Sequence, residues 1–97
     1  MNYNIAIVDE AKIDFRASLI WYKNINPKLS EKFYISFQQS VAIIKKDPLL
    51  FQIRYDNIRI KIMTPFPYLI HYIVNNNAIV IQAIYHCSRN SELNIFK

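Results

Sequence analysis

The chain has 97 residues, 53% of them hydrophobic and 20% charged, a composition typical of one small globular domain and not of a disordered chain. It contains no glycine, which excludes Walker loops, dinucleotide-binding fingerprints, nucleophile elbows and EF-hand loops, because each requires glycine at a fixed position. Twelve Lys and Arg against seven Asp and Glu give a net charge of +5, which favours an acidic or polyanionic partner.

The N-terminal region predicts a strand followed directly by a helix. Apolar side chains recur at every second position of residues 3–8, as in a half-buried strand. Asp9 is expected to cap the helix with its side-chain oxygen, and Glu10 adds favourable negative charge to the first turn. We expect this helix to end near residues 23–24. Its apolar stripe consists of Phe15, Leu19 and Tyr22.

A second helix is predicted over residues 26–46. Asn26 and Pro27 form a strong start signal, because asparagine caps helices well and proline tolerates the first helical position. Asp47-Pro48 ends the helix. Because few residues join the two helices, they should pack as an antiparallel hairpin. The apolar side chains at helical spacing are Leu29, Phe33, Phe37, Val41 and Ile44.

Three successive runs with a period of two follow, over residues 58–63, 68–74 and 79–86, and they predict an antiparallel β-meander. Asn75–Asn77 is expected to form a turn without glycine, since asparagine tolerates positive φ best among the other residues. The predicted fold is a two-layer α+β domain over residues 1–97, with the helix hairpin packed on one face of the sheet.

The polar residues that alternate with the apolar ones along these strands form a candidate functional surface. If the isoleucine-rich parity of each strand faces the helices, the opposite face carries Arg59, Lys61, His71, Gln82 and His86. Such a face suits phosphate binding, and histidine can act there as an acid or base. The alternative is that one sheet face is polar only because it is in contact with water. The pattern leaves both interpretations open.

The segment after the last strand contains His86, Cys87 and Arg89. A Cys–His nucleophilic pair is disfavoured, because adjacent strand residues point to opposite faces. Arg89 is better suited to hold a phosphate or to form an ion pair. Trp21 and Tyr22 are expected to pack or to contact a partner. With one cysteine, the chain has no internal disulfide and no Cys-based zinc site, and we expect neither a metal nor a cofactor.

The order of these features resembles toxins of the RelE/ParE superfamily of bacterial type II toxin–antitoxin systems. The resemblance extends from about Tyr3 to Glu92. The features that carry it are the strand leading into Asp9-Glu10-Ala11, the helix from Ser30-Glu31-Lys32-Phe33 to Asp47-Pro48, Ile58-Arg59-Ile60, the segment Phe66–Tyr72, and a last strand ending in His86 with Arg89-Asn90.

The resemblance implies a growth-arresting toxin that forms a hetero-oligomer with a cognate antitoxin. ParE-like members poison DNA gyrase and are not enzymes, whereas RelE-like members cut mRNA on the ribosome. For an endoribonuclease, His86 and His71 would be the catalytic residues, and in either case Arg59, Lys61 and Arg89 would bind phosphate or the target. The candidates for antitoxin contact are Trp21, Tyr22, Phe66 and Tyr68.

Two features favour the ParE-like, plasmid-stabilisation branch. The segment Phe66-Pro67-Tyr68 is similar to that branch, and the apolar end of the chain differs from the basic and aromatic tail of the RelE-like ribonucleases. A non-toxic family member that only binds its antitoxin is the third possibility. We expect a cytoplasmic protein without a membrane partner, because no apolar run approaches the length that spans a bilayer and the N-terminus does not resemble a signal peptide.

Overall fold

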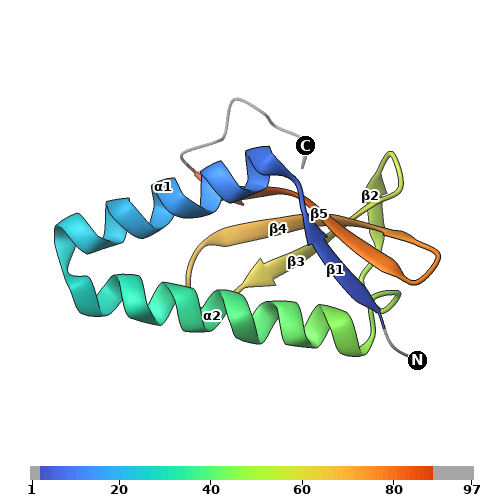
Figure 1. Cartoon of the computed structure of the whole chain (residues 1–97), viewed down its shortest axis with the longest axis horizontal. Helices are drawn as coiled ribbons and strands as arrows, with labels where there is room; N and C mark the ends of the chain where they lie inside the picture. Colours follow the sequence, from blue (N-terminus) through green and yellow to red (C-terminus); the bar gives the residue numbers. More distant parts are fainter. Residues whose placement is uncertain (1–2, 89–97) are drawn as a thin grey trace.

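The computed structural model describes residues 3–88, which form a helix hairpin packed on a five-stranded sheet (Figure 1). The two-layer α+β fold expected from the sequence is confirmed. In chain order the elements are β1 (Asn4–Ile7), α1 (Asp9–Ile25), α2 (Pro27–Lys46), β2 (Ile53–Tyr55), β3 (Ile58–Met63), β4 (Tyr68–Asn75) and β5 (Ala78–His86).

The sheet has the strand order β1-β5-β4-β3-β2 and is mixed. The predicted meander is the antiparallel part, β3-β4-β5, while β1 pairs parallel with β5 at the edge. Asn76 has a φ of 56°, as the expected asparagine turn requires. The sequence did not indicate β2, because three residues are too short to display a period. Asp56 and Asn57, with φ values of 43° and 64°, form the turn from β2 to β3.

The two helices begin in different ways. The expectation that Asp9 caps α1 is wrong: Val8 is the N-cap residue, no side chain caps it, and Asp9 is the first helical residue. Asp9 and Glu10 still place negative charge in the first turn, where the helix dipole favours it. Asn26 does cap α2, since its side-chain oxygen accepts the amide of Lys28 at 3.0 Å. The Asn26 amide also donates to the Tyr22 carbonyl at 2.8 Å, so one residue ends α1 and begins α2.

The core lies between the helix hairpin and the central strands. From α2, Phe33 and Ile44 are fully buried against the sheet. Phe15 of α1 packs on Phe37 with ring centroids 4.6 Å apart. The sheet contributes alternate residues, which identify its helix-facing side: Met63 of β3, Tyr68, Ile70 and Tyr72 of β4, and Ile79, Ile81 and Ile84 of β5.

The prediction of which β3 residues face the helices is wrong. Met63 pairs with Tyr68 and lies in the helix-side core, so Arg59 and Lys61, which share its parity, are on the helix side as well. The isoleucines of β3 lie on the opposite face, where Ile62 is 51% exposed. The loop after α2 supplies the physical reason, because it passes over this end of β3 and offers carbonyl oxygens to Arg59.

The prediction of which β5 residues face the helices is correct only for the first half of the strand. The register with β4 shifts between His71 and Tyr72, so that Tyr72 pairs with Ile81 while His71 pairs with Ala83. Gln82 is the extra residue of this bulge, and a bulge exchanges the faces of all positions after it. As a result His86 lies on the helix side and pairs with Tyr68. The expected grouping of cations and imidazoles on one sheet face is therefore wrong.

Candidate functional site

Arg59 is held by the backbone of the loop that follows α2. Its guanidinium nitrogen Nη1 donates to the carbonyl oxygens of Leu49, at 3.3 Å, and of Phe51. In the same region the Tyr72 hydroxyl donates to the Pro48 carbonyl at 2.8 Å, and burial raises the pKa of Tyr72 to about 12. The surroundings of Arg59 are those of a side chain that fixes a loop. Its proposed contact with phosphate or a target stays a prediction.

Lys61 lies two positions further along β3 and is half-buried. Its Nζ donates to the Ile62 carbonyl at 2.8 Å and lies 5.5 Å from the centre of the Phe51 ring. It lines a cavity of about 560 Å³ beside β2 and β3, whose other residues include Arg54, Leu69 and Cys87. The two cations of β3 thus lie on the helix side of the sheet, on the opposite face from His71.

His71 lies on the sheet face opposite the helices and is 0% exposed. Its Nδ1 is 3.0 Å from the Tyr55 hydroxyl, and its ring packs edge-on against Tyr85 with centroids 4.9 Å apart. Burial lowers the pKa of His71 from 6.5 to about 4. A buried imidazole that stays neutral at pH 7 is suited to packing between the strands. Its catalytic role in an endoribonuclease stays a prediction that this placement does not favour.

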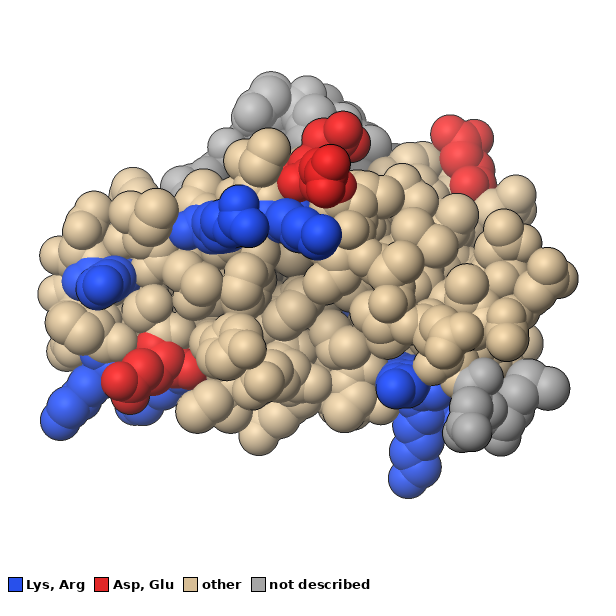
Figure 2. Space-filling view, viewed as in Figure 1, with Lys and Arg blue, Asp and Glu red and all other residues tan. Residues whose placement is uncertain are grey.

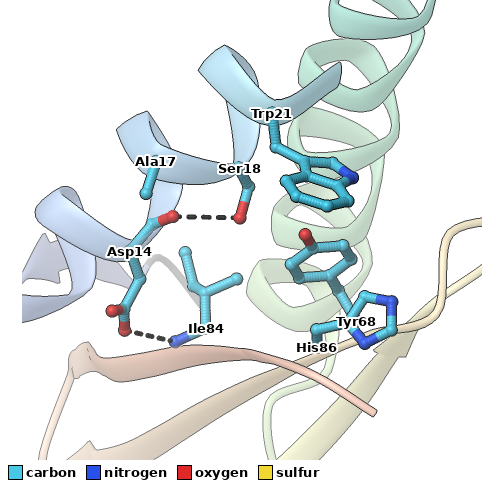
Figure 3. Close-up of a pocket in the computed structure, with 7 residues that line it drawn as sticks. All are labelled: Asp14, Ala17, Ser18, Trp21, Tyr68, Ile84 and His86. Carbon is cyan, nitrogen blue, oxygen red and sulfur yellow. Dashed lines mark hydrogen bonds between the residues drawn. The ribbon is translucent and has the colours of Figure 1, made fainter. Parts of the chain in front are cut away.

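His86 lines a cavity of about 230 Å³ between α1 and the ends of β4 and β5 (Figure 3). Its ring stands edge-on to Tyr68, with centroids 5.1 Å apart and an interplanar angle of 88°. The Ser88 amide donates to Nδ1 of His86 at 3.0 Å, a bond that only the neutral ring with a lone pair on Nδ1 accepts. We call this cavity the α1–β5 pocket. It is lined by Asp14, Ala17, Ser18, Trp21, Tyr68, Ile84 and His86.

The acidic group of the α1–β5 pocket is Asp14, which the sequence analysis missed. Its Oδ2 accepts the Ile84 amide at 3.2 Å, and its backbone carbonyl accepts the Ser18 hydroxyl at 3.0 Å (Figure 3). Burial raises the pKa of the Asp14 carboxyl, the Ile84 hydrogen bond opposes this shift, and Glu10 adds to it. The signal available in the sequence was the spacing of Asp14, Ser18 and Trp21, which places them on one face of a helix.

Three of the four candidates for antitoxin contact, Tyr22, Phe66 and Tyr68, form one aromatic cluster, and Trp21 lines the α1–β5 pocket with Tyr68. Trp21 is 50% exposed, whereas Tyr68 is 1% exposed. Tyr22 stacks on Phe33 at 5.4 Å and meets Phe66 edge-on at 5.1 Å, so both contribute to the core. Contact of these residues with an antitoxin stays a prediction, and Trp21 is the most exposed of the four. Arg89 lies outside the described residues.

On the face shown in Figure 2, the Lys and Arg side chains form no single continuous patch, and most of the surface between them is uncharged. Two hollows lie between the helices. Lys12 and Arg16 line one, beside Phe15 and Phe37, and Lys23 lines the other, beside Leu19. No helix within residues 3–88 is long and apolar enough to cross a membrane.

Comparison with solved structures identifies the fold. A chain in the structure titled "Chromosomal ParDE TA system from P. aeruginosa" superposes with a TM-score of 0.76, covering 87% of this chain and 95% of that chain, at 16% sequence identity. No family model and no curated protein matches the sequence. The chain therefore has the same fold as that chain of the ParDE system, in agreement with the α+β architecture expected from its sequence.

Proposed function

We propose that this protein is the toxin of a type II toxin–antitoxin module, that it acts in the cytoplasm on DNA gyrase, and that direct binding of a cognate antitoxin neutralises it. The observation that carries the proposal is the fold, which matches nearly the whole length of a chain from a ParDE system. The net charge of +5 suits an acidic antitoxin. In this proposal the protein is a poison and not an enzyme.

The positions of the cations favour gyrase over mRNA cleavage. Cleavage by the expected set needs cations and an imidazole around one scissile phosphate. Arg59 and Lys61 are near the β2–β3 edge on the helix side, His71 is buried on the opposite face, and His86 is at the end of β5. The sheet therefore separates His71 from the two cations, which supports the ParE-like alternative.

The first prediction concerns the target. The full chain, made by cell-free synthesis, should inhibit ATP-dependent supercoiling by purified gyrase, and an antitoxin encoded beside it should restore supercoiling. An Ile44→Asp variant at the same concentration controls for nonspecific effects of a basic polypeptide, because a carboxylate at this fully buried position should prevent folding. Normal supercoiling at saturating wild-type protein would exclude gyrase as the target.

One observation supports a second candidate, the RelE-like endoribonuclease. His86 shares a pocket with the Asp14 carboxylate and the Tyr68 ring, which are groups that can move protons. If this candidate is correct, the protein cuts ribosome-bound mRNA, and His86→Gln lowers the cleavage rate by about 100-fold or more. An antitoxin-binding protein that leaves growth and both assays unaffected would correspond to the third, non-toxic alternative.

A further inference from the structure

We infer that the α1–β5 pocket binds the guanidinium group of an arginine side chain presented by a partner polypeptide. The inference goes beyond the proposed function, because it does not depend on which cellular target the protein has. It rests on the charge of the pocket, its walls, and the surface beside it.

The charge of the pocket is opposite to that of the whole chain. Asp14 is half-buried, and within residues 3–88 its carboxylate accepts one hydrogen bond, from the Ile84 amide to Oδ2. The single ion pair found within residues 3–88 joins Lys12 to Asp9, at 4.0 Å, so none involves Asp14. Burial and Glu10 both raise the pKa of Asp14, which means that an added cation would stabilise its charged form.

The basic side chains of α1 do not compete for this pocket. Lys12, Arg16 and Lys23 line the hollows between α1 and α2, on the other side of the helix. In a protein with a net charge of +5, this is a site where an incoming cation meets a carboxylate without a neighbouring cation on α1.

The walls of the pocket suit a planar cation. Figure 3 shows Asp14 on one side, and the rings of Trp21 and Tyr68 on the other. The face of an aromatic ring attracts a cation, most strongly for tryptophan, and the flat, weakly hydrated guanidinium stacks on such faces better than an ammonium does. A guanidinium in this space can donate to Oδ1 of Asp14 while it packs against the half-exposed ring of Trp21.

The surface beside the pocket indicates that the arginine comes from a polypeptide. Two isoleucines on the outer side of α1, Ile13 and Ile20, are 62% and 59% exposed. They are seven residues apart and so share one helix face, next to the face that carries Asp14 and Trp21. Neighbouring apolar side chains in contact with water are typical of a protein-binding surface. A chain segment with apolar residues beside an arginine would cover both features.

The test uses the full chain and a single-guanidinium probe, N-acetyl-arginine N-methylamide. The chain has one tryptophan, so the indole N–H signal of Trp21 in a proton–nitrogen NMR spectrum reports binding without ambiguity. The uncharged citrulline analogue, which has almost the same shape, should bind at least about tenfold more weakly, as expected for the loss of a charge-assisted hydrogen bond. Equal binding of the two probes would refute the inference.

Two matched variants separate the pocket from the general charge of α1. Asp14→Asn keeps an oxygen for the Ile84 amide and removes only the charge, so it should fold and weaken the arginine probe about tenfold. Asp9→Asn removes the same charge from an exposed position of the same helix and should change binding less than about twofold. If both variants behave alike, or if Asp14→Asn binds as the wild type does, the pocket is not the site.

Two further arms identify the source of the arginine. An acetylated Leu-Arg-Leu peptide should bind at least about threefold more tightly than the single-residue probe, and Ile20→Ser should abolish this gain. Without a gain, the polypeptide source is wrong. Arg89→Gln should leave probe binding unchanged. If Arg89→Gln tightens binding about tenfold, the chain's own arginine occupies the pocket and a partner does not supply it.

Discussion

Single residues with similar chemistry have very different surroundings in this protein. The two histidines are one example: His71 is 0% exposed between β-strands, whereas His86 lines a pocket and receives a hydrogen bond from the backbone of Ser88. The two cations of β3 are another example. Backbone carbonyls of the loop after α2 hold the Arg59 guanidinium, whereas the Lys61 ammonium donates to the Ile62 carbonyl beside the Phe51 ring. Residue type alone therefore indicates little about which of these groups can meet a ligand.

The burial of His71 predicts a pH dependence of stability. Its pKa is about 4 in the folded chain and 6.5 ordinarily, so between these values the unfolded chain binds more protons than the folded one. The contribution of His71 to the free energy of unfolding should be fully present above pH 6.5. It should fall as the pH drops towards 4, by at most about 3 kcal/mol. Urea unfolding at a series of pH values measures the loss.

His71→Gln supplies the comparison for this prediction, because glutamine does not titrate in this range. The variant should be less stable than the wild type at pH 7, and the difference between the two should shrink as the pH falls from 6.5 to 4. A constant difference over this range would mean that His71 does not cause the pH dependence.

At the scale of elements, Asn26 joins the two helices. Its amide ends α1 on the Tyr22 carbonyl, and its side chain begins α2 on the Lys28 amide. The buried hydroxyl of Ser36 and the hydroxyl of Ser30 donate to backbone carbonyls outside α2, at 3.1 Å each. The hairpin is thus fixed to its surroundings by polar contacts as well as by its apolar stripe.

Because Asn26 caps α2, truncation of its side chain should lower the stability of the protein measurably. Asn26→Ala should lower the free energy of unfolding by about 1 kcal/mol, the usual value of an asparagine N-cap. Asn24→Ala makes the same chemical change at an exposed position in the last turn of α1, and it should cause no loss because alanine is the better helix former. Denaturant unfolding of both variants tests the prediction, which fails if their effects are equal.

At the scale of the whole molecule, the sheet is covered unevenly. The helix hairpin packs on one face, and β4 and β5, in the middle of the strand order, supply most of the sheet residues of the core. At one edge, β2 has only three residues, and Ile53 within it is 51% exposed. Stability should therefore decrease from the central strands towards the β2 edge.

Hydrogen exchange of the native protein should reveal this gradient. Backbone amides of β4 and β5 should exchange most slowly, close to the rate set by global unfolding, and those of β2 should exchange fastest among the strands. Measurement by NMR at neutral pH distinguishes the strands residue by residue. Equal protection of β2 and β4 would contradict the uneven covering.

The sequence by itself determined the elements whose residues repeat with a clear period and end at clear signals. The apolar stripe from Phe33 to Ile44 and the Asn26-Pro27 start defined α2, and alternation defined β3, β4 and β5. Together with the asparagine turn, these local patterns were sufficient for the two-layer fold. They succeed because helix and strand periods are properties of the backbone, which neighbouring residues alone express.

Only the tertiary structure decided which side chains meet. The bulge at Gln82 moves His86 to the helix side, and the loop after α2 draws Arg59 there as well, so both are separated by the sheet from His71 on the opposite face. The same packing brings Asp14 of α1 to Ile84 of β5, 70 residues away in the chain, and so creates the α1–β5 pocket. Register, bulges and contacts between layers depend on interactions across the whole fold, and a period in the sequence carries no information about them.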